Sequence, residues 1–156
     1  MRASRRDLLL GTAAASIALA RPALAAPAAE LERLLGLERR LEAAYAAALA
    51  RDAIEPGLGA RLLRHEREHV RGLQQALGSR GSEAAAPPAG IDLDDRRGFA
   101  RSALKLEREA VDAYQGVLPE LPDERLRQPL GSIMACGAQH QVALRQVLGV
   151  DLLRRN

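Results

Sequence analysis

The sequence contains few of the residues on which disulfide-bonded and β-rich proteins depend. One cysteine, one phenylalanine, two tyrosines and no tryptophan occur in its 156 residues. The single cysteine, Cys136, excludes an intramolecular disulfide framework and a zinc cluster of several thiolates within one chain. Valine, isoleucine and aromatic residues are scarce whereas Ala, Leu, Arg and Glu dominate, a composition that favours helices over β-sandwiches and barrels. We therefore predict one all-α domain.

The apolar stretch near the N-terminus is too short to cross a bilayer as a helix. It runs for 13 residues, from Leu8 to Ala20, where about 20 are needed. The preceding Ser-Arg-Arg-Asp segment resembles the twin-arginine export consensus, and the small residues that end at Ala25 match a cleavage site. We expect a twin-arginine signal peptide over residues 1–25, export to the periplasm, cell envelope or extracellular space, and no stable membrane anchor after cleavage.

A surplus of positive charge is absent once this N-terminal segment is set aside. The whole chain has 23 basic and 20 acidic residues, and residues 1–25 account for four of the basic and one of the acidic ones, which leaves 19 of each. Such a chain has neither the basic surplus that neutralises phosphates nor the aromatic side chains that stack on bases. We therefore expect no nucleic-acid partner.

Apolar residues at helical spacing predict four helices, separated by segments rich in proline and glycine. The predicted helices span Ala29–Arg51, Leu58–Leu77, Asp95–Leu118, and a fourth segment that begins at Asp123 or Pro129 and ends at Leu148. The connection between the second and third helices, Gly78–Asp94, could extend about 50 Å, more than the about 30 Å length of a 20-residue helix. This pattern indicates two antiparallel hairpins joined by a long crossover.

The two predicted hairpins repeat one another. The matching positions are Glu38 and Glu107, Tyr45 and Tyr114, and His69 and His140. The first two pairs share an offset of 69 residues and the histidines are 71 residues apart. Because Glu, Tyr and His coincide in the same order, we interpret the chain as a duplicated helical hairpin.

At about 100° per residue, every predicted helix places a potential metal ligand on its apolar face. These inward residues are Glu38 and Glu42 in the first helix, Glu66 and His69 in the second, Glu107 in the third, and His140 in the fourth, with Cys136 one turn earlier on the same face. An unpaired carboxylate in an apolar interior costs several kcal/mol, and most of the arginines lie on outer faces. The most favourable internal partner is therefore a divalent or trivalent cation. Imidazole groups would complete the coordination of that cation.

Three other interpretations of these residues stay open. The buried carboxylates could form a polar network with the histidines and with Tyr45 and Tyr114. His140 could be an ordinary core histidine, and Cys136 a small buried apolar residue. The segment His65–His69 also matches HExxH, the zinc-protease signature, although no third-ligand motif follows it.

From about Glu30 to Gly149 the chain resembles bacterial exported ferritin-like proteins. In these proteins each of two hairpins supplies a glutamate from its first helix and an ExxH motif from its second, and together they hold two iron or manganese ions. The matching positions here are Glu38, Glu66, His69, Glu107 and His140, with Gly137 where the second ExxH glutamate would stand. The resemblance implies a ferritin-like four-helix bundle over residues 26–156 that retains five of the six ligands.

The resemblance also implies a function. We expect the protein to bind one or two iron or manganese ions and to take part in redox chemistry or iron handling. Glu42 or Cys136 could replace the ligand missing at Gly137, one ion could bind alone, or the site could be a relic. In the last case the protein would be a non-catalytic helical scaffold or binding module. The expected partners are a metal ion and, if the chain assembles, a second copy in a homodimer.

Overall fold

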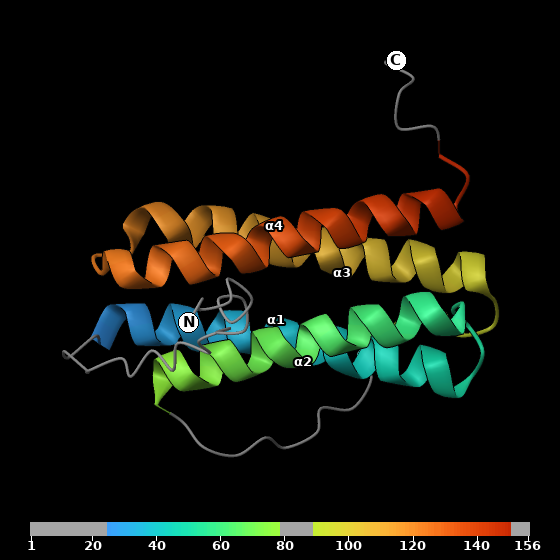
Figure 1. The fold of residues 1–156 in the computed structure, drawn as a ribbon, viewed down its shortest axis with the longest axis horizontal. Helices are drawn as coiled ribbons and strands as arrows, with labels where there is room; N and C mark the ends of the chain where they lie inside the picture. The colour runs from blue at the N-terminus through green and yellow to red at the C-terminus, as the bar shows by residue number, and fades with distance from the viewer. Residues whose placement is uncertain (1–24, 79–88, 151–156) are drawn as a thin grey trace, which may run out of the picture.

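The computed structural model describes residues 25–78 and 89–150, which form four long helices (Figure 1). They are α1 (Ala25–Ala50), α2 (Pro56–Leu77), α3 (Arg96–Val117) and α4 (Glu124–Val147), and a short 3-10 helix, η1 (Leu118–Glu120), follows α3. These two ranges contain no β-strand, so the predicted all-α fold is confirmed. The predicted signal peptide, apart from Ala25, and most of the predicted crossover lie outside the described residues.

The helices form two hairpins that pack against each other as a four-helix bundle (Figure 1). Within the first hairpin α1 runs antiparallel to α2, and within the second α3 runs antiparallel to α4. Across the bundle α1 contacts α3, and α2 contacts α4. α2 ends at one end of the bundle whereas α3 begins at the other (Figure 1). This is the arrangement expected of two hairpins whose connection passes along the bundle.

Capping side chains explain where two of the helices begin. The Glu55 carboxylate accepts hydrogen bonds from the N–H groups of Gly57 and Leu58, at 2.8 and 2.6 Å, and so satisfies two free donors at the start of α2. Asp95 caps α3 in the same way. α2 ends at Leu77 and is capped by Gly78, whose φ of 64° is a left-handed conformation that glycine adopts without strain.

The sequence offers two starts for the fourth helix, and the structure selects the first. The Asp123 side chain accepts a hydrogen bond from the N–H of Arg125 and caps α4, which begins at Glu124. The helix then continues through Pro129. Because proline has no N–H, its presence there removes one backbone hydrogen bond without ending the helix.

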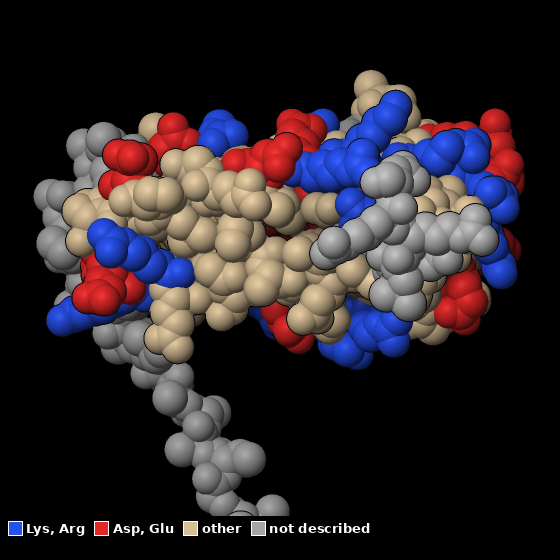
Figure 2. Space-filling view, turned by 90° about the horizontal axis from the view of Figure 1, so that it is seen from above, with Lys and Arg blue, Asp and Glu red and all other residues tan. Residues whose placement is uncertain are grey.

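Apolar side chains from all four helices form the core, and a group of polar residues is buried among them. The buried polar residues are Glu38, Glu66, His69, Glu107, His140 and Gln141. The other charged residues in the described part of the chain are half-buried or exposed, and on the face in Figure 2 acidic and basic groups are interspersed around an uncharged area. No helix within residues 25–78 or 89–150 combines the length and the hydropathy that crossing a membrane requires.

Candidate metal centre

The five predicted ligands lie together in the middle of the bundle, and every helix contributes at least one. They are Glu38 from α1, Glu66 and His69 from α2, Glu107 from α3 and His140 from α4, and each is at most 8% exposed. Their ligand atoms form two overlapping groups, one of Glu38, Glu66 and His69 and one of Glu66, Glu107 and His140. Within each group the atoms lie within 4.8 Å of one another. Glu66 belongs to both groups and therefore occupies the centre of the cluster.

The two histidines present the same ring nitrogen to the carboxylates. His69 Nδ1 lies 3.0 Å from Glu38 Oε2 and 3.5 Å from Glu66 Oε2. His140 Nδ1 lies 2.9 Å from Glu66 Oε1 and 3.1 Å from Glu107 Oε1. Glu66 thus directs one oxygen toward each histidine. Although these ion-pair contacts are short, neither Glu66 oxygen has a hydrogen-bond partner of good geometry in the described part of the chain.

The cluster has the symmetry of the sequence repeat. The pair Glu38 and His69 in the first hairpin corresponds to Glu107 and His140 in the second, and the two pairs have nearly equal separations of 3.0 and 3.1 Å. The repeat partner of Glu66, 71 positions later, is Gly137. The duplicated arrangement is therefore complete in the first hairpin and lacks one carboxylate in the second.

Gly137 is buried and faces the cluster. A Cβ atom built on Gly137 would lie 3.4 Å from Glu107 Oε2 and 3.1 Å from Val111 Cγ2, so a side chain at this position would point toward the carboxylates. A cavity of about 10 Å³ adjoins Gly137 and is also lined by Glu38, Glu66, His69 and Glu107. That volume is about the size of one water molecule. The missing carboxylate thus leaves a small space beside the remaining ligands.

Burial and ionic contacts shift the pKa values of the cluster in opposite directions. Burial raises the pKa of Glu38 to about 7, in spite of the hydrogen bond from His69. Burial also opposes the ionisation of Glu66, but contacts with His140 and His69 outweigh it and lower its pKa. Burial lowers the pKa of both histidines, yet contacts with Cys136 and the carboxylates raise the pKa of His69 to about 12 and that of His140 to about 11. In the metal-free protein, protons on the imidazoles therefore balance the charge of Glu66.

Two buried tyrosines flank the carboxylates. The Tyr45 hydroxyl donates a hydrogen bond of 2.6 Å to Glu107 Oε1, and so links α1 to α3 across the two hairpins. The repeat-related Tyr114 is buried near Glu38, and burial followed by the charge of Glu38 raises its pKa. Unlike Tyr45, the Tyr114 hydroxyl has no hydrogen-bond partner of good geometry among the described residues. The two tyrosines therefore differ in their hydrogen bonding to the cluster.

Glu42 does not lie where the helical pattern predicts. Its side chain is 27% exposed and forms an ion pair of 3.2 Å with Arg67 on the neighbouring helix. Glu42 lies at the edge of the apolar stripe of α1, next to α2, and Arg67 reaches it from the outer side. Glu42 is absent from all three groups of potential ligands in the described residues. The expectation that Glu42 faces the core is therefore wrong.

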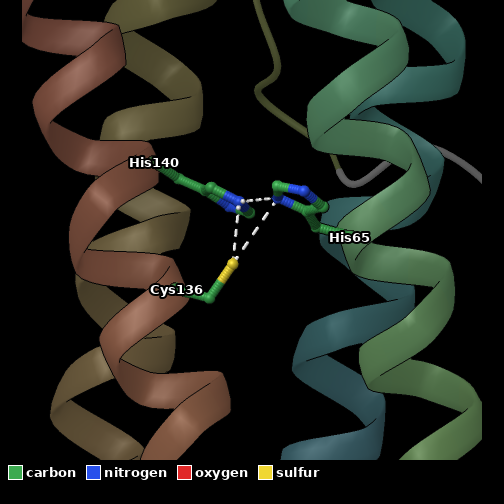
Figure 3. A group of neighbouring side chains, drawn as sticks. All are labelled: His65, Cys136 and His140. Atoms are coloured by element: carbon green, nitrogen blue, oxygen red, sulfur yellow. Dashed lines mark hydrogen bonds between the residues drawn. The ribbon is translucent and has the colours of Figure 1, made fainter. Parts of the chain in front are cut away.

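Cys136 belongs to a second group of potential ligands, together with His65 and His140 (Figure 3). Its Sγ lies 3.3 Å from His140 Nε2 and 3.6 Å from His65 Nδ1. Burial raises the pKa of the Cys136 thiol, but the contacts with His140 and His69 outweigh it and lower the pKa to about 7.

The two histidines of the HExxH pattern, His65 and His69, fall in different groups of potential ligands. This separation is unlike a zinc-protease site, in which both histidines bind one ion.

Sequence reasoning did not predict two of the residues around the cluster. His65 contacts His140 Nε2 at 3.0 Å, although helical phase places it only at the flank of the apolar stripe. Gln141 is buried and its side-chain N–H donates a hydrogen bond of 3.3 Å to the backbone carbonyl of Glu107, which joins α4 to α3. A signal for His65 exists in the repeat, because His65 and Cys136 are 71 residues apart, as are His69 and His140.

A family model described as a ferritin-like domain matches residues 28–150. The match covers all four helices apart from the first residues of α1. The chain therefore belongs to the ferritin-like domain family, in agreement with the bundle and with the residues that converge in it. No curated protein and no solved structure matches the chain significantly.

The different hydrogen bonding of the two tyrosines gives a stability prediction. Tyr45→Phe removes the hydrogen bond to buried Glu107 with little change in volume, and we expect it to lower the free energy of unfolding of the metal-free protein by about 1 to 3 kcal/mol. Tyr114→Phe removes a hydroxyl that lies near Glu38 but has no hydrogen-bond partner of good geometry among the described residues, and its effect should be smaller, within about 0.5 kcal/mol, or stabilising. Urea unfolding followed by circular dichroism measures both, and equal losses in the two variants would contradict the assigned hydrogen bonds.

Proposed function

We propose that the protein binds iron or manganese, as one or two ions, at the carboxylate and histidine cluster. We further propose that it uses the bound metal in redox chemistry or iron handling outside the cytoplasm. The observation that carries the proposal is Glu66. Its carboxylate is 1% exposed, it lies between two histidine nitrogens, and neither of its oxygens accepts a well-formed hydrogen bond. In the metal-free protein the protonated imidazoles balance this buried carboxylate, and a bound metal cation would take over that role in place of their protons.

The donor set fits iron or manganese better than calcium or magnesium. Three carboxylates and two imidazoles offer oxygen and nitrogen ligands, whereas calcium and magnesium sites in proteins are built from oxygen alone. Glu38 and His69 would hold a cation from the first hairpin, Glu107 and His140 from the second, and Glu66 could serve both. When bound, iron would supply one-electron redox chemistry. The surrounding leucine-rich core would keep bulk water from the ligands.

Export by the twin-arginine route suits this function. The route carries folded proteins, so a chain with the arginine pair of residues 5 and 6 could take up its metal before export. The support for this part of the proposal is the N-terminal sequence pattern alone.

Gly137 favours a second candidate function. Because one of the six ligands is missing, the fold could instead serve as a non-catalytic scaffold or binding module that keeps the buried polar cluster as a remnant of a metal site. The two candidates differ in one measurable respect, which is whether the cluster gains stability from added metal.

Metal binding and its effect on stability test the proposed function. We expect the protein, purified without chelators, to contain iron or manganese by elemental analysis, and the Glu66→Gln and His69→Ala variants to contain much less. Added Mn²⁺ should stabilise the wild type by about 2.7 kcal/mol when its free concentration exceeds the dissociation constant a hundredfold. That stabilisation should raise Tm by several degrees in a domain of this size. Glu66→Gln should show no such shift.

Glu68→Gln is the matched control, because Glu68 lies on the same helix but is exposed. This variant should keep the metal content and the thermal shift of the wild type. If Mn²⁺ and Fe²⁺ shift neither protein and the metal content is the same in all variants, the metal proposal is wrong and the scaffold is favoured.

Restoring the missing carboxylate gives a test in the opposite direction. Gly137→Glu directs a side chain from a Cβ position that faces Glu107. Val111 need move only a few tenths of an ångström to admit the Cβ, and the rest of the side chain needs more room than the adjoining cavity of about 10 Å³ offers, so neighbouring side chains must shift further. We expect this variant to bind more metal per chain than the wild type, measured by elemental analysis after dialysis against Mn²⁺. Gly137→Ala adds the Cβ without a ligand and should leave the metal content unchanged. A folded Gly137→Glu protein with no gain in metal would show that the position is not part of a metal site.

A further inference from the structure

A second group of potential ligands lies beside the carboxylate cluster, between α2 and α4 (Figure 3). His65 projects from α2, and Cys136 and His140 project from α4 one turn apart toward the same point. His65 and Cys136 are half-buried, whereas His140 is 3% exposed. A cation from solvent could therefore reach the group from the side of His65 and Cys136.

The separations within this group match those between the ligands of a tetrahedral metal site. Zinc binds thiolate sulfur at about 2.3 Å and imidazole nitrogen at about 2.0 to 2.1 Å, so tetrahedral geometry separates two nitrogens by about 3.3 Å and a nitrogen from a sulfur by about 3.6 Å. Here His65 Nδ1 lies 3.0 Å from His140 Nε2. Cys136 Sγ lies 3.6 Å from His65 Nδ1 and 3.3 Å from His140 Nε2. Movements of a few tenths of an ångström would bring all three atoms into coordination.

We propose that His65, Cys136 and His140 form a separate site for a thiophilic transition-metal cation, Zn²⁺ or a copper ion. One thiolate and two imidazoles are ligands that such ions prefer, whereas iron and manganese in carboxylate sites are bound mainly by oxygen. The site has three protein ligands in the described part of the chain, and this number leaves a fourth position open for water or a small molecule.

His140 Nδ1, the ring nitrogen that faces away from Cys136 and His65, supports the proposed site by contacting buried carboxylates. While Nε2 faces Cys136 and His65, Nδ1 lies 3.1 Å from Glu107 Oε1 and 2.9 Å from Glu66 Oε1. With metal on Nε2, the N–H at Nδ1 would donate to a carboxylate, and this is the outer contact that fixes the ring of most metal-bound histidines. One imidazole serves either site through a different nitrogen, so the thiophilic site does not require metal at the carboxylates.

Cobalt binding tests this site directly, because Co²⁺ substitutes for Zn²⁺ and a thiolate ligand gives a near-ultraviolet charge-transfer absorption. We expect the untagged, reduced full chain to develop this absorption when titrated with Co²⁺ and to lose it when Zn²⁺ is added. Cys136→Ser should abolish the absorption. His65→Ala should weaken Co²⁺ binding at least tenfold, since losing even an outer-shell partner costs about 10- to 100-fold.

Glu38→Gln is the matched control, because Glu38 contacts His69 rather than any of the three ligands. This variant should keep the cobalt absorption, and Cys136→Ser and His65→Ala should keep the Mn²⁺-dependent thermal shift, so that the two proposals fail independently. Absence of the absorption in the folded wild type, or unchanged affinity in His65→Ala, would overturn the proposal. Loss of the absorption in folded Glu38→Gln would also overturn it, because Cys136 would then be an additional ligand of the carboxylate site.

Discussion

The burial of charged carboxylates inside an apolar bundle is the constraint on which the rest of the structure depends. Glu38, Glu66 and Glu107 are each at most 2% exposed, and water therefore cannot balance their charge. The folded chain places an imidazole against every one of them, and each glutamate comes from a different helix. The relative rotation of the helices is thus tied to the pairing of these side chains, since turning one helix would leave a charge buried without a partner.

The duplicated hairpin is symmetric in its glutamate–histidine pairs and asymmetric in its remaining ligands. The first hairpin has Glu66 at the centre of the cluster, whereas the second has Gly137 at the repeat-related position. One residue before Gly137, α4 carries Cys136 where α2 has His65. Compared with α2, the same short segment of α4 therefore lacks an oxygen ligand and carries a sulfur ligand, and both differences alter which cations the middle of the bundle favours.

Local patterns explain why most of the fold could be predicted from the sequence. Helical spacing of apolar residues, together with proline and glycine between the segments, gives the helices to within a few residues, and the same spacing gives the inward direction of the five buried ligands. Glu42 shows the limit of this reasoning. It lies at the border of its stripe, where helical phase alone cannot tell burial from an ion pair with a residue of the next helix such as Arg67.

The group of His65, Cys136 and His140 could not be predicted from helical phase for a related reason. It depends on which faces of α2 and α4 meet, and this is set by packing between residues more than 70 positions apart. It also depends on the orientation of one imidazole, because His140 uses both ring nitrogens. The sequence carries one relevant signal, namely that His65 and Cys136 occupy equivalent positions in the repeat.

The central claim is that Glu66 and its neighbouring histidines hold a cation. The most direct test is a crystal structure of the protein grown with Mn²⁺, with anomalous scattering recorded at the manganese absorption edge. The account predicts an anomalous peak in contact with the Glu66 carboxylate and with Nδ1 of His69 or His140. Manganese bound only to surface carboxylates, with Glu66 contacting nothing but the protonated histidines, would contradict it.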